Sequence, residues 1–392
     1  MQEVTKIEAC RLCRGKKLTD IYDFGRPRLS AFTKLREVVK VPRTPIKLVR
    51  CEVCKLVQLS HTAPFAFMYS NQYWYKSNVN PVIVDDLKEI AGIASKYAGE
   101  KGTVISIGEN DGTLLSFVKK GIRRIAVEPA SNLIPELEQH ADIVHNMFWE
   151  NVETERANVI VAIGMLYDLE DPNAFMENVR EHLEPGGIFI AQLMTLRPML
   201  ENADMGNICA EHLEFYTYDN LKQLFERNDL EIFRVEENGI NGGSYRLYAR
   251  ALKKGSVDFQ EEEPDFDLFV RQLEGNRAET FKFIRWAHSM GKKVYVYGAS
   301  TKANAILQWY GIDNGLIEGA ADRNPAKWGT YMSAGSIPVV DEESARKAAD
   351  VFLVMPYGFR EHFIEREKAW LQSGGVMVFC MPKFEILTQE DL

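Results

Sequence analysis

The chain has 392 residues, more than one ordinary hydrophobic core accommodates, which predicts two or three domains. Its 46% hydrophobic and 26% charged content is typical of globular proteins, and no apolar run approaches the roughly 18 residues of a membrane span. The first ten residues, MQEVTKIEAC, lack the apolar core of a secretory signal. These features disfavour a membrane or secreted protein, and we expect a cytoplasmic one.

The net charge of −9 is unevenly distributed along the chain. Residues 1–75 carry 14 Lys and Arg against 6 Asp and Glu, a net charge of +8, which leaves −17 for the remainder. A basic module on an acidic body favours an anionic ligand, either nucleic acid or a phosphorylated small molecule. The alternative interpretation is an ordinary solvated surface.

Four of the six cysteines form two CxxC pairs near the N-terminus, Cys10 with Cys13 and Cys51 with Cys54. Two such pairs in a cytosolic chain predict a tetrahedral zinc site with four thiolate ligands. Disulfides are not expected in a reducing compartment. Because four protein ligands close the coordination shell, the zinc is expected to be structural, and a small folded insert is expected between the two pairs.

Helices and strands alternate from about residue 83. Residues 84–98 are amphipathic at helical spacing, and 103–107 predict a buried strand that leads through a Gly-rich turn into a second helix. A helix is also predicted over 172–183. The remaining predicted strands are 124–129, 159–164, 187–193, 231–237 and 244–252, of which the last two form a terminal antiparallel hairpin.

The turn after the first of these strands has the pattern Gly108-x-Asn110-x-Gly112, and Glu128 ends the next strand about 20 residues later. This arrangement is typical of Rossmann-like nucleotide sites, in which glycines admit the ligand and the acid binds ribose hydroxyls. The spacing fits S-adenosylmethionine (SAM) better than a dinucleotide. A surface role for Glu128 and a helix N-cap role for Asp111 are the alternatives. The predicted cofactor residues are Gly108, Asn110, Asp111, Gly112, Glu128 and Pro129.

A second strand–turn–helix unit follows a polar, acidic stretch, 253–266, that is predicted to be a linker. A helix is predicted over 268–290, then a strand, a Gly-rich turn and a helix over 292–307, and three more parallel strands at 317–322, 350–356 and 376–382. The turn opens a helix, whose free N–H groups attract anions, and Lys302 strengthens that attraction. Helix capping by Ser300 or Thr301 is the alternative and leaves Lys302 unexplained.

The order of these motifs resembles the SAM-dependent sugar C-methyltransferases, which methylate carbon 3 of nucleotide-linked 4-ketohexoses. The resemblance covers nearly the whole chain. Besides the CxxC pairs, it rests on YWYKSNVN (73–80), SIGENDGTLL (106–115), AEHLEF (210–215), NGGSYRLYA (241–249), YGASTKANAIL (297–307) and DRNPAKWG (322–329).

This resemblance implies an α/β protein of three domains. They are a zinc-binding module (1–80), a class I SAM methyltransferase domain of Rossmann-like fold (81–252) and a C-terminal Rossmann-like domain (253–392) that binds the sugar nucleotide. The implied cofactors are SAM and structural Zn²⁺. The implied partner is a ketosugar linked to dTDP or GDP, with no nucleic acid and no membrane, and a monomer is expected.

The resemblance also implies the chemistry and its residues. A ketone at carbon 4 acidifies the proton on carbon 3, so that a base can form an enolate that attacks the SAM methyl group. The base of the family falls in the pair Glu211 and His212. Both lie in the connection 194–217, which leaves the carboxyl end of a predicted strand, where ligands of such sheets bind. The carboxylate is expected to orient the imidazole or raise its basicity.

The chain departs from the family pattern at three positions. Cys209 replaces a tyrosine that is a candidate for contacting the keto-enolate. Tyr167 replaces a histidine, and a tyrosine there can still hydrogen-bond the sugar or the enolate oxygen. Ser106 replaces a common acid of the SAM turn. Glu211, His212, Tyr167 and Cys209 are therefore the candidate catalytic residues of an altered sugar pocket.

The resemblance assigns a further group of residues to the substrate. For Tyr73 the alternative is packing at a domain junction beside Trp74, and for Arg323 and Lys327, which are placed to reach the phosphates, it is ordinary surface charge. The predicted substrate-binding residues are Tyr73, Tyr75, Ser77, Asn241, Lys302, Asn304 and Arg323.

Other classes of function fit the sequence less well. A zinc-containing RNA methyltransferase agrees with the basic N-terminal module, but the acidic body is a poor surface for nucleic acid. A nicotinamide-dependent oxidoreductase requires a GxGxxG turn, which GASTKAN lacks. A methyltransferase that acts at another position of the sugar, or a non-catalytic binding module, is the remaining alternative.

Overall fold

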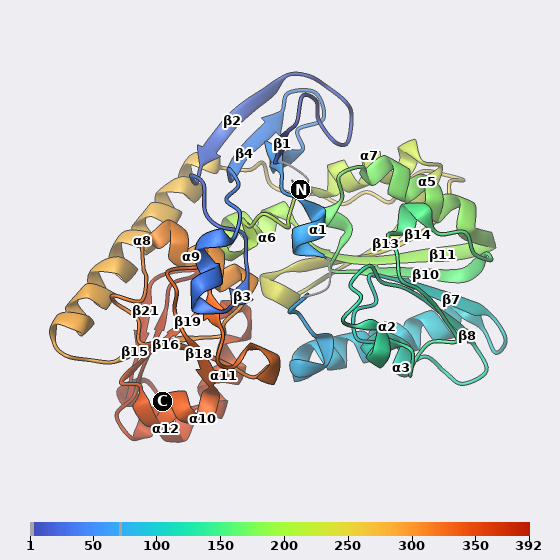
Figure 1. Ribbon diagram of the computed structural model, residues 1–392. Helices are drawn as coiled ribbons and strands as arrows, with labels where there is room; N and C mark the ends of the chain where they lie inside the picture. The colour runs from blue at the N-terminus through green and yellow to red at the C-terminus, as the bar shows by residue number, and fades with distance from the viewer. Residues whose placement is uncertain (1–3, 70–72) are drawn as a thin grey trace.

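In the computed structural model, which describes residues 4–69 and 73–392, a small N-terminal module lies across two α/β lobes (Figure 1). We call residues 4–69 the zinc module, 73–265 the middle lobe and 266–392 the C-terminal lobe. In Figure 1 the zinc module is blue, the middle lobe cyan to yellow and the C-terminal lobe orange to red. The zinc module contacts both lobes.

A seven-stranded sheet forms the centre of the middle lobe, with the strand order β13-β14-β11-β10-β7-β8-β9. Strand β14 is antiparallel to both of its neighbours, whereas β11, β10, β7, β8 and β9 are parallel. The predicted strands and the terminal hairpin are confirmed, and the short β9 was not predicted. The strands are β7 (Thr103–Ile107), β8 (Arg123–Val127), β9 (Ile143–His145), β10 (Ala157–Ile163), β11 (Leu183–Met194), β13 (Leu230–Asn238) and β14 (Ser244–Ala251).

Helices cover both faces of this sheet, as expected of a Rossmann-like lobe. The predicted helix over 84–98 begins earlier, at Pro81, because the Asn80 side chain accepts a hydrogen bond from the Val82 N–H and Pro81 suits the first helical turn. It ends at Gly99, whose φ of 74° favours glycine. The helices are α2 (Pro81–Ala98), α3 (Thr113–Ser116), α4 (Ile134–Leu137), α5 (Pro172–His182), α6 (Leu196–Glu201) and α7 (Tyr218–Arg227).

The C-terminal lobe contains a six-stranded sheet with the order β18-β16-β15-β19-β20-β21, in which only β21 is antiparallel. The three strands predicted to be parallel are confirmed as β16, β19 and β20. Its strands are β15 (Val294–Tyr297), β16 (Gly319–Asp322), β18 (Val339–Asp341), β19 (Val351–Val354), β20 (Val376–Phe379) and β21 (Glu385–Leu387). Its helices are α8 (Phe266–Ser289), α9 (Thr301–Tyr310), α10 (Glu342–Ala348), α11 (Arg360–Arg366) and α12 (Lys368–Gln372).

The stretch predicted to be a linker has no regular structure but is attached to the middle lobe. The Val257 N–H donates to the Ile232 carbonyl over 2.8 Å, and the Phe259 ring packs on Tyr218 and Tyr245. Glu261 accepts a hydrogen bond of 2.7 Å from the Tyr245 hydroxyl. This stretch therefore follows the surface of the middle lobe before α8 begins.

The zinc module is built from short strands that pair with all parts of the chain. Strands β2, β4 and β5 form one sheet, whose edge strand, β12 (Glu214–Phe215), comes from the middle lobe. Strand β3 pairs with β17 (Tyr331–Met332) of the C-terminal lobe. The expected folded insert between the CxxC pairs is present. The elements of the module are β1 (Thr5–Lys6), β2 (Leu18–Asp23), β3 (Phe32–Thr33), β4 (Lys47–Cys51), β5 (Val57–Leu59), β6 (His61–Thr62), α1 (Phe65–Met68) and a 3-10 helix (Leu35–Lys40).

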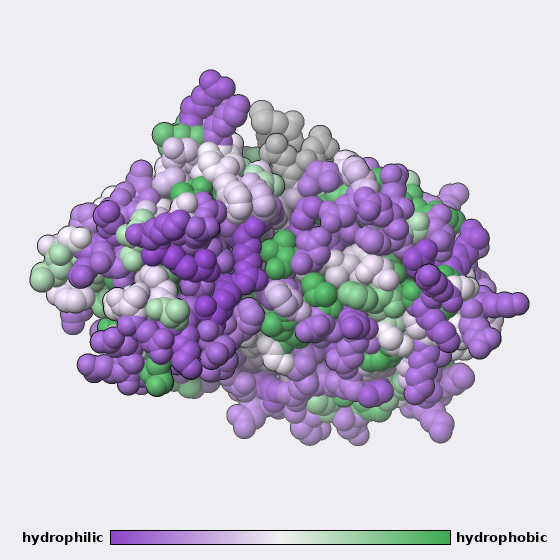
Figure 2. All heavy atoms as spheres, turned by 90° about the horizontal axis from the view of Figure 1, so that it is seen from below, coloured by the Kyte–Doolittle hydropathy of each residue, from purple (hydrophilic) through white to green (hydrophobic). Residues whose placement is uncertain are grey.

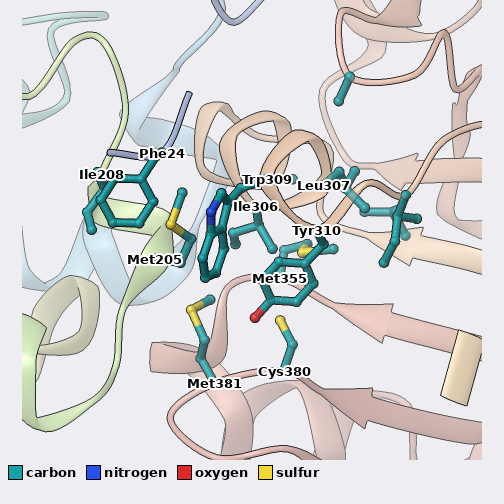
Figure 3. Packing of buried hydrophobic residues seen from close by; sticks show 14 of the residues in the cluster. Phe24, Met205, Ile208, Ile306, Leu307, Trp309, Tyr310, Met355, Cys380 and Met381 are labelled. Atoms are coloured by element: carbon teal, nitrogen blue, oxygen red, sulfur yellow. The ribbon is translucent and has the colours of Figure 1, made fainter. Parts of the chain in front are cut away.

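A hydrophobic cluster joins the three parts of the molecule. Phe24 of the zinc module packs against Met205 and Ile208 of the middle lobe and faces Trp309 of α9 (Figure 3). The centroids of the Phe24 and Trp309 rings are 5.4 Å apart in an edge-to-face arrangement. Burying each such side chain contributes roughly 2–3 kcal/mol, so this cluster holds the zinc module against both lobes.

The surface of the molecule is mostly hydrophilic, and several of its basic residues near the N-terminus form ion pairs. Hydrophilic residues cover most of the face in Figure 2, and several hydrophobic residues gather near its middle. Cations of residues 1–76 pair with acids of the middle lobe in the ion pairs Arg14–Asp171, Lys76–Glu136 and Arg11–Glu170. Part of the positive charge near the N-terminus is therefore paired with acids of the middle lobe and is not available to an anionic ligand. No helix among residues 4–69 and 73–392 is long and apolar enough to cross a membrane.

Candidate active site

A cavity of about 300 Å³ lies where the middle and C-terminal lobes face each other. The carboxyl ends of β7, β10 and β11 form one wall, and residues 300–302 and 355–359 of the C-terminal lobe form the opposite one. The site residues predicted from the sequence that line it are Tyr73, Tyr75, Ser77, Gly108, Tyr167, Glu211, His212, Asn241, Lys302 and Lys327.

His212 is held by a backbone carbonyl in one orientation. Its Nδ1 lies 2.8 Å from the Asn207 carbonyl oxygen, which can only accept a hydrogen bond, so Nδ1 carries a proton. In the neutral ring Nε2 is then free of a proton, and it has no hydrogen-bond partner among the described residues. Burial, together with the nearby Lys302 ammonium, lowers the pKa of His212 to about 3, so the ring is neutral at physiological pH.

The ring of Tyr167 packs edge-to-face on this imidazole, with 4.5 Å between the ring centroids. Tyr167 lies in the turn after β10 and lines the cavity. Its carbonyl accepts a hydrogen bond of 2.8 Å from the Leu213 N–H, which fixes the two segments to each other. A phenol and an imidazole thus meet at the carboxyl edge of the sheet.

Glu211 lines the cavity beside His212, but it does not orient the imidazole. The expected contact with the ring nitrogen is made instead by the Asn207 carbonyl. Burial raises the pKa of Glu211 to about 7, outweighing hydrogen bonds from its own backbone N–H and from the Cys209 thiol. This carboxyl can therefore exchange a proton near neutral pH.

Asp168 is a cavity residue that the sequence reasoning missed. Its Oδ1 is buried and has no hydrogen-bond partner among the described residues, and burial raises its pKa well above the ordinary value. The only available signal was its position directly after Tyr167, at the carboxyl end of a predicted strand.

The Gly-rich turn after β7, which we call the first glycine turn (108–112), is rich in acids. The Gly108 N–H donates to the Val127 carbonyl over 2.8 Å, which brings the turn close to the end of β8. The Glu128 carboxylate accepts hydrogen bonds from the Asn110 and Ala130 N–H groups, of 2.9 and 2.8 Å. Burial raises the pKa of Glu128, and of Glu109 to about 8. Glu128 and Pro129 support this turn from outside the cavity.

Two side chains of the first glycine turn hold residues 75–78 over it. The Asn110 Oδ1 accepts a hydrogen bond of 3.0 Å from the Ser77 N–H, and its Nδ2 donates to the Tyr75 carbonyl over 3.1 Å. The Asp111 carboxylate accepts a hydrogen bond of 2.9 Å from the Asn78 N–H. Asp111 also accepts a hydrogen bond of 3.2 Å from the Thr113 N–H, but the N-cap position of α3 is held by Gly112, so the capping alternative does not apply to Asp111. Asn110, Asp111 and Gly112 do not line the cavity; the first two shape its wall.

A buried ion pair that was not predicted lies behind this wall. Arg246 of β14 pairs with Asp86 of α2 over 2.8 Å and donates from Nε to the Gln192 Oε1 over 2.8 Å. Asp86 and Gln192 line the cavity. Since the three residues lie on separate elements far apart in sequence, no local pattern could have revealed them.

The opposite wall is formed by the second glycine turn (298–302) at the start of α9. The Ser300 hydroxyl accepts a hydrogen bond of 3.1 Å from the Ala303 N–H, so the capping alternative holds for this residue. Lys302 takes no part in this cap. Its Nζ lies 3.8 Å from the Asp204 carboxylate and 3.4 Å from the Asn241 carbonyl oxygen. Lys327 donates to the Ala299 carbonyl over 2.7 Å. Lys327 also pairs with the Asp322 carboxylate over 2.9 Å, so this wall carries two lysines, each balanced by an acid of the C-terminal or middle lobe.

Three of the predicted catalytic and substrate-binding residues lie outside the cavity. Asn304 is 1% exposed, and its amide bonds Ser30, Ser333 and the backbone, which leaves no group for substrate. Arg323 lies 3.5 Å from Glu342. Cys209 lines a separate, much smaller pocket beside Asn304. For these three, the predicted contact with substrate is not supported by their positions.

The four cysteine sulfurs lie within 4.8 Å of one another. The distances between Cys10 and Cys54 and between Cys13 and Cys51 are both 3.5 Å. A tetrahedral zinc ion with Zn–S bonds of about 2.3 Å separates its sulfurs by ~3.8 Å, so the four side chains fit the ion. The two pairs sit in equivalent turns, each followed by a residue with positive φ, Arg14 and Lys55.

Comparison with known proteins also divides the chain into three segments, of which the third begins before β14 of the middle lobe. Three family models match consecutive segments: a zinc binding domain over residues 10–69, a methyltransferase domain over 75–235 and a C-methyltransferase C-terminal domain over 239–382. The C-methyltransferase NovU of Streptomyces niveus is 24% identical over 100% of this chain and 99% of its own length. These matches identify the chain as a SAM-dependent C-methyltransferase.

Other relatives match only part of this C-methyltransferase. A ubiquinone biosynthesis O-methyltransferase of Nitrobacter winogradskyi is 27% identical over 35% of the chain and 59% of its own length. The structure of the CcbJ methyltransferase from Streptomyces caelestis covers 47% of the chain and 95% of its own, at 15% identity and a TM-score of 0.36.

Proposed function

We propose that this C-methyltransferase methylates carbon 3 of a nucleotide-linked 4-keto-6-deoxyhexose through an enolate. The observation that carries the proposal is the cavity itself. It places a neutral imidazole with a free Nε2 between a glycine turn with buried carboxyl groups on one wall and a turn with Lys302 on the other. SAM carries a sulfonium cation and ribose hydroxyls, which suit acidic side chains, whereas a sugar nucleotide carries a diphosphate, which suits lysines.

In the proposed reaction His212 is the base. Its Nε2 takes the proton from carbon 3, and the electron pair of that C–H bond forms the enolate. The enolate carbon then attacks the SAM methyl carbon, so that a C–C bond forms as the S–CH₃ bond breaks and S-adenosylhomocysteine leaves. The proton passes from His212 to solvent, and one proton is released in each turnover.

A base with a pKa of about 3 is weak, and the structure offers a physical reason for it to strengthen. Lys302 is one of the two causes of the low pKa of His212. A diphosphate bound at Lys302 would neutralise that charge and raise the basicity of the imidazole. In this proposal, binding of the sugar nucleotide activates the base beside it.

We assign the contact with the enolate oxygen to Tyr167. Its phenol packs against His212 and lines the cavity, whereas Cys209, which stands where the family has a tyrosine, lies in the neighbouring pocket. A phenol donates a hydrogen bond to an oxyanion, and burial keeps its pKa well above the ordinary value, so the proton remains available. Glu211, with its pKa near 7, is placed to relay the proton toward solvent.

The remaining assignments follow the walls of the cavity. Gly108 would contact SAM, supported by Glu128 and Pro129. Lys302 with Lys327 would contact the diphosphate of a dTDP or GDP sugar, and the other substrate-binding residues would be Tyr73, Tyr75, Ser77 and Asn241. Cys10, Cys13, Cys51 and Cys54 would hold one structural zinc ion. We propose a monomer as the active form.

Solvent exchange tests the base directly. A panel of 4-keto sugar nucleotides is incubated in D₂O with the enzyme, with and without SAM, and deuterium is located by NMR. We expect exchange at carbon 3 with the native protein, and a loss of at least a hundredfold in exchange and in methylation with His212→Asn, while SAM binds normally.

The matched control is His182→Asn. The Nδ1 of His182 also lies 2.9 Å from a backbone carbonyl, that of Asn178, but at the end of α5, outside the cavity. This variant should exchange and methylate as the native protein does. Normal turnover of His212→Asn would show that the base is elsewhere. Exchange at carbon 5 instead of carbon 3 would show that the enolate carbon, and hence the methylated carbon, is carbon 5.

A further inference from the structure

The segment that carries the base is completed by the zinc module. Strand β12 begins two residues after His212 and is the edge strand of the sheet of the zinc module. It pairs antiparallel with β5, with Glu214 opposite Gln58. The Leu59 N–H donates to the Leu213 carbonyl over 2.9 Å. The residues directly after the base therefore take their sheet partners from the zinc module and not from the sheet of their own lobe.

Arg11 connects this sheet to the first cysteine pair. It lies inside the turn between Cys10 and Cys13, is 1% exposed, and donates from its guanidinium to the Leu59 carbonyl over 2.7 Å and to the Thr62 hydroxyl over 2.8 Å. Its backbone N–H donates to the Gln58 Oε1 over 3.1 Å. The turn that holds two of the sulfurs thus also holds β5 in place.

The second cysteine pair makes a parallel connection. The Asn220 amide donates to the Cys54 carbonyl over 2.7 Å, and Asn220 lies in α7, the helix that follows β12. Within the middle lobe, the Leu213 N–H donates to the Tyr167 carbonyl. Both cysteine turns are consequently tied to the chain that directly follows His212.

The side chains of this segment do little to fix its position. Glu214 is 1% exposed, and neither of its carboxylate oxygens has a hydrogen-bond partner among the described residues. The Tyr216 hydroxyl and the Gln58 Nε2 are buried and unpartnered in the same way. Since these polar groups make no bond within the protein, the position of β12 depends on packing and on backbone bonds, to β5 on one side and to Tyr167 and Leu196 of its own lobe on the other.

We propose that the zinc module is a positioning device for the base and that Arg11 is its positioning residue. Zinc would fix the turn of Cys10 and Cys13, and Arg11 would hold β5 against that turn. Strand β5 would in turn fix the position of Leu213, and hence of His212 in the cavity. This inference rests on the proposed function in taking His212 as the base. It gives the structural metal a direct role in turnover, without contact with either substrate.

The test uses the zinc-loaded Arg11→Lys variant. A lysine keeps the charge but cannot reach the Leu59 and Thr62 acceptors with one planar fork. We expect one zinc per chain and native SAM affinity, as for the wild type. Backbone amides 213–216 should exchange with D₂O at least tenfold faster, and solvent exchange of the ketosugar and methyl transfer should both fall about tenfold or more.

The matched control is Arg14→Lys, in the same turn. Arg14 also bonds the middle lobe, through Asp171, but makes no contact with β5. It should leave amide exchange at 213–216 and turnover unchanged. A second variant, Gln58→Met, keeps Arg11 and all four cysteines, removes the acceptor of the Arg11 N–H and should shift both readouts in the same direction.

Two results would overturn the proposal: native protection of amides 213–216 in both Arg11→Lys and Gln58→Met, or faster amide exchange with unchanged turnover. Amide exchange is measured without any sugar. Failure of this inference can therefore be told apart from failure of the proposed base, which His212→Asn tests alone.

Discussion

The two glycine turns of the molecule share a backbone plan and differ in charge. Each follows the first strand of a parallel unit and leads into a helix, α3 in the middle lobe and α9 in the C-terminal lobe. The first is surrounded by Glu109, Asp111 and Glu128, all buried. The second carries Lys302 and is supported by Lys327. Because the two turns hold the same place in their parallel units, the side chains around each turn decide which ligand it suits.

The comparison also shows how one cavity can take two substrates of different charge. The carboxyl groups of the first turn suit the sulfonium and ribose hydroxyls of the cofactor, and the lysines of the second turn suit a diphosphate, so each ligand fits one turn better than the other. His212 lies between the walls, where the methyl donor and the sugar would meet. The alignment of the two substrates thus depends on the side chains around the two turns. Variants that change one turn at a time should affect one ligand at a time.

The largest effect is expected from Lys302→Met, which removes the cation of the second glycine turn. A hydrogen bond to a charged group contributes about 1.5–3 kcal/mol, so affinity for dTDP or GDP should fall roughly tenfold to a hundredfold. SAM affinity should not change. Isothermal titration calorimetry with each ligand alone measures both quantities.

The control for that variant is Lys347→Met, which removes an exposed lysine of α10 that pairs with Glu343. It should bind both ligands normally. An equal loss of SAM affinity in Lys302→Met would contradict the separation of the two walls.

A smaller effect, on SAM instead of the nucleotide, is expected from Glu128→Gln. The carboxylate accepts two backbone N–H bonds, and an amide can accept only one of them while its NH₂ group faces the other. SAM affinity should fall about tenfold, with nucleotide affinity unchanged. Glu138→Gln, an exposed acid at the end of α4, is the control; unchanged SAM affinity in Glu128→Gln would show that this acid does not support the cofactor turn.

The smallest effect concerns stability and pH. Burial raises the pKa of Glu109 from 4.5 to about 8, so the folded protein retains a proton that the unfolded chain releases near pH 4.5. Native stability that is present below pH 4.5 is therefore lost as pH rises to about 8. Without SAM, the Tm of Glu109→Gln relative to the wild type should increase between pH 5 and 8. A difference in Tm that is independent of pH would contradict the buried, protonated state.

Much of the fold was predictable because its signals are local. The strands of the middle sheet and helix α2 follow hydrophobic periodicity, and two CxxC pairs bring four sulfurs together wherever the intervening chain lies. The short strands β9, β18 and β21 have only three residues each, too few for a periodic signal. Periodicity alone could not have identified them.

The candidate site was predictable only in part, for a different reason. His212, Tyr167 and Lys302 lie in motifs that the resemblance could identify, and the structure brings all three to one cavity. Pairings between distant segments, such as β12 with β5, leave no local pattern in a single sequence. The same holds for Arg246 with Asp86, and the position of Cys209 outside the cavity required the structure.

The position of the transferred methyl group tests the account most directly. The enzyme is incubated with SAM labelled with ¹³C in its methyl group and with a panel of 4-keto sugar nucleotides, and the product is examined by NMR. We expect a ¹³C-methyl group bonded to carbon 3 of the sugar, and none of this product with His212→Asn. A label on oxygen or nitrogen, or no labelled sugar from any member of the panel, would contradict the proposed carbon methylation.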